Sequence, residues 1–336
     1  MLGGLLRGVG RVLVQGVAIV VLSATLLELL VAGSFRYPAW SPLPRPVLRQ
    51  MHVLFDRNTI QAMPECARYD DTLTYTLRPG QCTFSNREFT TRFEINALGF
   101  RDDAASLDRP EIIVLGDSLA MGWGVDQDAA FPSVVERLTG RRTLNAGVSS
   151  YGTVRELRAL ERVDRRAVTD VVIQYSSNDL DENEALTAGR FKTLTREAYE
   201  HTVLAQAEMR RYHPGKHALN LLVMLRNLAL QRGVVVTPPS RRHEVEVFLE
   251  VLARSPVDLT SYAVTVLSLD GDFIEAVRPL AAASPVPAIA RLHFVDASPI
   301  ASLPGAFYVL DDHPTRIGQH AIGRALADAL SVGDTP

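Results

Sequence analysis

The clearest pattern along the chain is an alternation of short apolar runs with segments of helical periodicity. Five apolar runs are predicted as strands, at residues 111–115, 143–146, 170–175, 262–269 and 290–295. Four segments place apolar residues on one helical face, at residues 130–138, 154–165, 272–282 and 315–330. This alternation is typical of βαβ units, so the sequence predicts an α/β fold whose parallel sheet is covered by helices on both faces.

A helical insertion is predicted where the alternation stops, at about residues 185–260. It contains three helical segments, at residues 195–211, 218–230 and 244–252. The middle segment is the most apolar of the three, yet it is too short to span a bilayer. A buried helix, a lid over the active site and a segment on the membrane surface are the three interpretations left open.

The N-terminal segment consists of one long apolar run. Arg7 and Arg11 precede this run, which extends from Val12 to about Gly33 and has Glu28 as its only charged residue. A run of about 20 residues is long enough to cross a bilayer, and its basic flank is expected to stay in the cytoplasm. The alternative is a cleaved signal peptide, whose apolar region is usually about 7 to 15 residues long. We expect an uncleaved signal anchor, with Glu28 near its outer end or against a partner helix.

The segment that follows the anchor is predicted to be a spacer and then a small β-rich layer. Four prolines between residues 37 and 46 exclude a helix interior there. Residues 72–77 and 90–95 alternate in the manner of half-buried strands. The predicted division is therefore a cytoplasmic stub and transmembrane signal anchor at 1–35, a proline-rich spacer and β-rich segment at 36–110, and a main domain at 111–330 that carries the insertion.

Composition narrows the class of protein. The formal charge is −3 over 336 residues and no Lys/Arg-rich run stands out, which argues against nucleic acid as a partner. No metal-ligand motif or phosphate loop occurs, so neither a metal nor a cofactor is expected. The two cysteines, Cys66 and Cys82, both precede the sheet. Outside the cytoplasm they can form a disulfide, and two buried thiols are the alternative.

The candidate chemistry lies where predicted strands end. Residues 116–119, Gly-Asp-Ser-Leu, follow the first strand of the sheet. A serine there, beside the N–H groups of a helix start, lies where open α/β sheets bind their ligands, although a simple helix-capping serine is the alternative for Ser118. Three further polar segments follow later strands, at residues 145–152, 176–179 and 311–314.

In this order the four segments resemble the motif blocks of the SGNH hydrolase superfamily, the GDSL-type esterases and lipases. The resemblance covers about residues 111–330 and implies a three-layer α/β/α fold with a five-stranded, flavodoxin-like parallel sheet. It also implies a serine esterase that works without a cofactor. Residues 96–101, Asn-Ala-Leu-Gly-Phe-Arg, resemble a segment common upstream of the catalytic strand in membrane-anchored bacterial members, without indicating its role.

The expected catalytic residues are Ser118, His313 and Asp311. A serine hydroxyl needs a base within hydrogen-bond reach, and His313 follows the last strand at the sheet edge that carries Ser118. The family more often has Asp-x-x-His, but position 310 is a leucine. An alternating extended backbone would turn Asp311 and His313 to the same side, so Asp311 is the expected orienting carboxylate and Asp312 its alternative.

The expected oxyanion donors are the backbone N–H groups of Ser118 and Ser150 and the side-chain amide of Asn178. Ser150 stands where the broad family has glycine, beside Gly147, and a positive φ there would carry strain. Ser176 likewise replaces a glycine. We interpret Asp117 and Asp179 as supporting carboxylates that bind loop N–H groups, with Gly147 also in a supporting role.

The predicted function is hydrolysis of short acyl or acetyl esters through an acyl-enzyme on Ser118. An O-acyl or O-acetyl transferase acting on envelope or extracellular polysaccharide is the nearer alternative, and a catalytically silent binding module the more distant one. The expected substrate is a small-molecule or glycan ester. The expected location is the bacterial inner membrane, crossed once, with the catalytic domain on the periplasmic or extracellular side; the oligomeric state is left open.

Overall fold

The computed structural model describes residues 2–230 and 240–332, which fall into two compact units. The first unit comprises residues 1–57, 208–236 and 309–311, and the second comprises 58–207, 237–308 and 312–336. Each unit has its own hydrophobic core.

The second unit contains the predicted five-stranded parallel sheet. Its strands are β5 (Ile112–Leu115), β6 (Thr143–Asn145), β7 (Asp170–Tyr175), β8 (Ala263–Ser268) and β9 (His293–Asp296). They lie in the order β6-β5-β7-β8-β9, and every neighbouring pair is parallel. Along the chain this is the order 2-1-3-4-5, which is the flavodoxin-like arrangement of doubly wound sheets. The predicted α/β fold class is confirmed.

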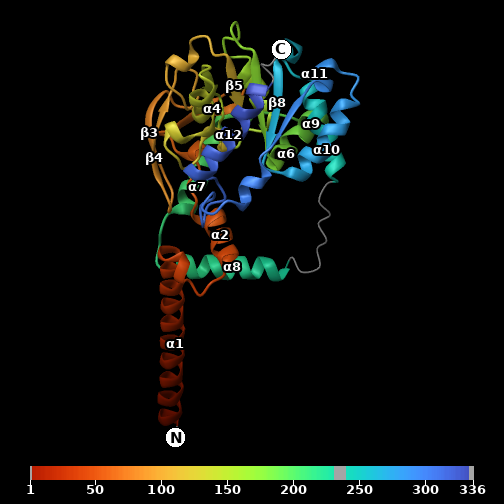
Figure 1. The fold of residues 1–336 in the computed structure, drawn as a ribbon. Helices are drawn as coiled ribbons and strands as arrows, with labels where there is room; N and C mark the ends of the chain where they lie inside the picture. The colour runs from red at the N-terminus through yellow and green to blue at the C-terminus, as the bar shows by residue number, and fades with distance from the viewer. Residues whose placement is uncertain (1, 231–239, 333–336) are drawn as a thin grey trace. The chain divides into compact units, whose positions relative to one another are not determined.

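Helices cover both faces of this sheet (Figure 1). The helices of the unit are α3 (Ser118–Met121), α4 (Phe131–Thr139), α5 (Thr153–Leu160), α6 (Leu180–Thr187), α9 (Arg241–Ala253), α10 (Gly271–Ala282), α11 (Pro287–Ala290), α12 (Arg316–Val332) and most of α7 (Arg196–Arg210). Alternate residues of β5 belong to different cores: Ile112 and Val114 pack with α4 and α12, whereas Ile113 and Leu115 pack with α5, α9 and α10. Side chains that point to opposite faces explain why the strand is a continuous apolar run.

Two antiparallel hairpins precede the sheet and form the small β-rich layer. They pair β1 (Ala67–Asp70) with β2 (Thr74–Leu77) and β3 (Gly80–Ser85) with β4 (Thr90–Ile95). Cys66 and Cys82 form a disulfide with 5.4 Å between their Cα atoms, which ties the start of the first hairpin to the second.

The first unit is built on the long N-terminal helix. It contains α1 (Leu2–Arg36), α2 (Arg45–Met51), a π-helical turn at His52–Asp56 and α8 (Lys216–Leu230). Its core joins Val31, Phe35, Leu48, Met51, Leu221, Met224 and Leu310. Residues Gly10–Arg36 of α1 are long and apolar enough to cross a membrane, judged by length and composition.

Some elements differ from the sequence prediction. The proline-rich spacer contains α2, which begins at Arg45 with a proline in its first turn, where a missing N–H costs nothing. The strand expected at 290–295 begins only at His293, because α11 occupies the residues before it. β1 and β3 gave no clear alternation in the sequence, since they are short and pair only within hairpins.

We predict that the disulfide stabilises the hairpin layer. Replacing both Cys66 and Cys82 by alanine should lower the free energy of unfolding by about 3 kcal/mol, because a bridge across some 16 residues restricts the unfolded chain. Thermal or urea unfolding of the variant beside the wild type measures the loss. A variant that unfolds at the wild-type midpoint would contradict this role, and free alkylation of both thiols in the unreduced protein would contradict the bond.

Candidate active site

Ser118 lies at the carboxyl end of β5, as the first residue of α3. The turn before it depends on Gly116, whose φ is +155° and whose missing Cβ would lie 2.6 Å from the Gln174 side-chain oxygen. Asp117 caps the short helix by accepting a hydrogen bond of 2.8 Å from the Leu119 N–H. A larger residue at 116 would clash with β7, so the glycine allows the strand to end directly in an accessible serine.

The Ser118 hydroxyl and the His313 ring are in direct contact. Ser118 Oγ lies 2.7 Å from His313 Nε2, the geometry in which the hydroxyl donates to a neutral imidazole. His313 is held in a closed loop, since Tyr308 N–H donates to its carbonyl at 3.1 Å and residues 307 and 314 form a β-bridge. The structure thus joins two residues that lie 195 positions apart in the sequence.

The two aspartates before His313 have different surroundings. Asp312 Oδ1 lies 3.3 Å from His313 Nδ1, and its side chain is 55% exposed. Asp311 is fully buried in the first unit, with its carboxylate 3.8 Å from Arg57 and 3.9 Å from His52. Within the second unit, the carboxylate beside His313 Nδ1 is therefore that of Asp312, which was the alternative in the sequence analysis. The orienting role expected of Asp311 stays a prediction.

Ser150 occupies the left-handed region of the backbone map, with a φ of +59°. A non-glycine residue held there carries strain of about 1–3 kcal/mol, and neighbouring groups must hold it in place. Gln61 Nε2 donates to its hydroxyl at 3.0 Å and Arg155 donates to its carbonyl. The Tyr75 hydroxyl also donates to the carbonyl of the preceding residue, Ser149. Ser150 thus holds a conformation that glycine adopts without strain.

Asp117 links the nucleophile turn to the segment that contains Asn178. Burial raises the pKa of Asp117, whereas the bond from Leu119 N–H, the nearby His313 and hydrogen bonds from Ser176 and Asn178 lower it. An amide has two N–H donors, so binding Asp117 uses only one of those of Asn178. The supporting role expected of Asp117 stays a prediction.

Gly147 brings the second motif block close to α3. A Cβ at Gly147 would lie 2.5 Å from the Met121 N and 2.7 Å from the Ala120 Cβ. The Val148 N–H donates to the Gly116 carbonyl at 3.0 Å, which fixes the two turns to each other. A side chain at 147 would push the Ser150 turn away from the nucleophile.

Arg101 is a buried residue of the site that the sequence analysis could not assign. It is fully buried, and its guanidinium donates to the carbonyls of Met121 at 3.1 Å, Gly122 at 2.5 Å and Val125 at 2.6 Å. Burial lowers its pKa to about 9, so it stays charged at neutral pH. It therefore holds the backbone that leaves α3, where the carbonyls at a helix end attract a cation.

The segment held by Arg101 carries Trp123. The Trp123 indole stacks on the His313 ring with 4.5 Å between centroids and 15° between planes. Trp123 also meets Phe84 of the hairpin layer edge-on at 4.6 Å. The stacked aromatic face restricts the orientation of the imidazole. The sequence analysis singled out residues 96–101, but the sequence alone does not show that Arg101 contacts the backbone at the end of α3.

We predict that Trp123 positions His313, the expected base. Trp123→Leu should lower kcat about 3- to 10-fold with little change in KM, which corresponds to the loss of one aromatic pair. Trp123→Phe keeps a stacking ring and should restore most of the rate. Ester turnover by the three proteins, with melting temperatures measured in parallel, tests this. A Leu variant with wild-type kcat, or one that loses only stability, would contradict it.

A buried group of acidic residues lies behind the oxyanion segments. Asp179 accepts a hydrogen bond from the Thr153 hydroxyl at 3.0 Å, and its expected supporting role stays a prediction. Within the described part of the chain, both carboxyl oxygens of the fully buried Glu156 lack a hydrogen-bond partner. Burial raises the pKa of Glu156 well above its usual value, and the charges of Asp179 and Asp117 raise it further.

This burial predicts a pH-dependent stability. Folded Glu156 retains a proton that the unfolded chain releases above about pH 4.5, so the stability falls as pH rises from there towards the raised pKa. Glu156→Gln removes the titration, and its melting temperature should exceed that of the wild type by a margin that grows with pH. The exposed Glu161→Gln is the matched control and should show no such trend. A margin for Glu156→Gln that stays constant between pH 4 and pH 8 would contradict the prediction.

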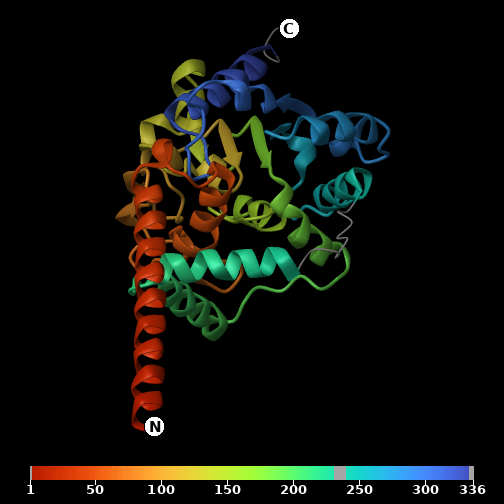
Figure 2. The same ribbon diagram turned by 90° about the horizontal axis from the view of Figure 1, so that it is seen from below.

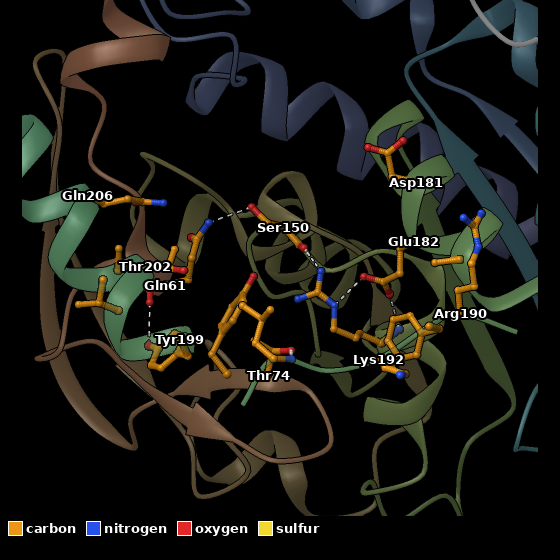
Figure 3. A pocket seen from close by; sticks show the side chains of 17 residues that line it. Gln61, Thr74, Ser150, Asp181, Glu182, Arg190, Lys192, Tyr199, Thr202 and Gln206 are labelled. Atoms are coloured by element: carbon orange, nitrogen blue, oxygen red, sulfur yellow. Dashed lines mark hydrogen bonds and ion pairs between the residues drawn. The ribbon is translucent and has the colours of Figure 1, made fainter. Parts of the chain in front are cut away.

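A cleft of about 450 Å³ borders Ser150 (Figure 3). Its walls come from the residues before the hairpins, the Ser150 turn, the residues of and after α6, and α7. Its lining is mixed: polar side chains such as Gln61, Lys192 and Gln206 lie beside apolar ones such as Phe191, Leu194 and Val203. Because Gln61 and Arg155 both line the cleft and bind Ser150, a ligand in the cleft would contact the groups that hold the strained residue.

Comparisons with known proteins give similar structures but no sequence match. No family model and no curated protein matches the chain. A protein described as lipolytic, of the G-D-S-L family, from Desulfitobacterium hafniense DCB-2 is 10% identical with a TM-score of 0.35, covering 65% of this chain and 98% of its own. A carbohydrate esterase family 2 enzyme with a carbohydrate binding domain from Corynascus thermopiles is 14% identical with a TM-score of 0.40, covering 67% and 66%.

A third similar structure is a protein assigned as a platelet activating factor from Streptococcus pneumonia, 14% identical with a TM-score of 0.37, covering 68% of this chain and 86% of its own. The three structures are at most 14% identical to this chain, with TM-scores of 0.40 or less.

Proposed function

We propose that this chain is a membrane-anchored serine hydrolase of carboxylic esters, with Ser118 as the nucleophile. The observation that supports this most directly is the 2.7 Å contact between Ser118 Oγ and His313 Nε2, at the carboxyl end of a parallel sheet. The neighbouring donors and the strained Ser150 fit the same reaction class.

In the proposed reaction His313 takes the hydroxyl proton as Ser118 Oγ attacks the ester carbonyl. The tetrahedral intermediate collapses to an acyl-enzyme when His313 returns that proton to the leaving alcohol. Water then attacks the acyl-enzyme, with His313 again as the base, and releases the acid and free Ser118. The oxyanion would be bound by the N–H groups of Ser118 and Ser150 and by the Asn178 amide.

The orienting carboxylate is proposed to be Asp312, on the basis of its 3.3 Å distance to His313 Nδ1. Asp311 remains the alternative, because it is fully buried and a buried carboxylate holds a ring more rigidly than an exposed one. Asp312→Asn and Asp311→Asn measured side by side separate the two roles. The orienting residue is the one whose change lowers kcat without lowering the melting temperature.

The cleft beside Ser150 supports a hydroxyl-rich alcohol as the other half of the ester. Amides, hydroxyls and charged groups line part of it and can bind sugar hydroxyls, while Phe191, Leu194 and Val203 add apolar surface. The same cleft gives a reason to retain transfer to a sugar as the second candidate function. Acyl groups found on an added oligosaccharide, in place of free acid, would identify transfer.

The site is proposed to face the outside of a bacterial inner membrane, with α1 crossing it once. The apolar helix, the basic residues before it and the disulfide support this placement.

The proposed function predicts that Ser118→Ala abolishes turnover of p-nitrophenyl acetate and labelling by a fluorophosphonate probe. Asn178→Ala should lower kcat about 10²- to 10³-fold. The probe should still label this variant, but more slowly than the wild type. Ser133→Ala removes only a hydroxyl bonded to the Gln127 carbonyl and is the control, with wild-type activity expected. Unchanged turnover or labelling in Ser118→Ala would overturn the proposal and favour a binding module.

A further inference from the structure

Helix α8 exposes a row of leucines to its surroundings. Leu219, Leu222, Leu225 and Leu228 follow one another at a spacing of three, and each is between 48% and 57% exposed. Residues three apart on a helix are neighbours, so these four form a continuous stripe, which winds about half-way round the helix because three residues fall short of a full turn of 3.6. A stripe of this kind exposed to water is unfavourable, and it marks a surface that another apolar phase covers.

The orientation of α8 is fixed by contacts within the first unit. The Glu28 carboxylate of α1 accepts a hydrogen bond of 2.8 Å from the Ala218 N–H, in the first turn of α8. Lys216 pairs with Asp56 at 2.9 Å, and both side chains are buried. On the covered side Leu221 packs into the core shared with α1 and α2. These contacts leave the leucine stripe uncovered in the described part of the unit.

The two ribbon views show α8 crosswise to α1 (Figures 1 and 2). Glu28 lies five residues before Gly33, where the apolar run of α1 ends. At a rise of 1.5 Å per residue this is about 7.5 Å along the helix axis. An amphipathic helix in a membrane interface buries its apolar face about 5–10 Å below the headgroup boundary, so α8 meets α1 at the depth where such a helix lies.

Two aromatic residues just beyond α1 indicate the same position for the membrane interface. Tyr37 is 62% exposed and Trp40 is 87% exposed. Tyrosine and tryptophan concentrate at membrane interfaces, where one part of the ring is apolar and the other is hydrated. Arg226 on α8 has a long stem that can lie along apolar surface while its charge reaches the headgroups.

We propose that α8 lies in the outer interface of the bilayer that α1 crosses, with its leucine stripe covered by lipid. This inference rests on the proposed anchoring of α1 and extends it: the enzyme would be held by one spanning helix and one surface helix. A surface helix of this kind restricts how the first unit tilts on the membrane, which a single spanning helix cannot do.

Site-directed fluorescence of the full chain in vesicles of phosphatidylethanolamine and phosphatidylglycerol tests the proposal. A polarity-sensitive dye is attached to Leu222→Cys on the stripe, to Asn227→Cys on another face of α8, or to Val20→Cys in α1. Both native cysteines are in the disulfide and do not react. Lipids brominated near the headgroup or at the chain end then report the depth of each dye.

The dye at Leu222→Cys should be quenched by headgroup-proximal bromine at least about threefold more than the dye at Asn227→Cys. The dye at Val20→Cys should be quenched best by chain-end bromine, which checks the anchor separately. Quenching at Val20→Cys with none at Leu222→Cys overturns the inference and leaves the anchor in place. Quenching at neither position overturns both. Lipid-independent shielding at Leu222→Cys would identify a protein as the covering surface and also overturn the inference.

Discussion

The turn at Gly116 is the constraint on which the candidate site depends. The chain must leave a fully buried strand at Leu115 and present a serine three residues later, and the side chain of Gln174 on β7 leaves no room for a Cβ at Gly116. The Asp117 N–H donates to the same Gln174 side chain at 3.2 Å, so the neighbouring strand both shapes and holds the turn. Strand order therefore determines the position of the nucleophile, because β7 must lie next to β5.

Residues outside the four motif blocks complete the site. Arg101 from the segment before the sheet binds the carbonyls after α3, and the chain it holds carries the indole stacked on His313. Gln61, also from before the sheet, binds the strained Ser150. The hairpin layer and its flanking residues thus help to hold the candidate site, which gives a physical reason for a disulfide in that layer.

Ser150 illustrates how a departure from a family pattern can be accommodated. A serine in the left-handed region is strained, but its hydroxyl provides a contact that glycine lacks, to Gln61 at 3.0 Å. Together with the Arg155 bond to its carbonyl, this contact connects the Ser150 backbone to the polar cleft. Glu28 is a comparable case in α1, where a charged group in an apolar run is matched by the start of α8.

The amino-acid pattern alone predicts the α/β class, the five strands of the sheet and most helices, because buried parallel strands and amphipathic helices leave periodic apolar patterns. It also indicates Ser118 and His313, since strand ends of a parallel sheet meet at one edge. Three contacts became visible only in the folded chain: Asp312 lies beside His313, Arg101 binds the end of α3, and α8 packs on Glu28. These contacts depend on where side chains point and on which distant segments meet in the fold. The periodic pattern of apolar residues along the chain carries no information about either.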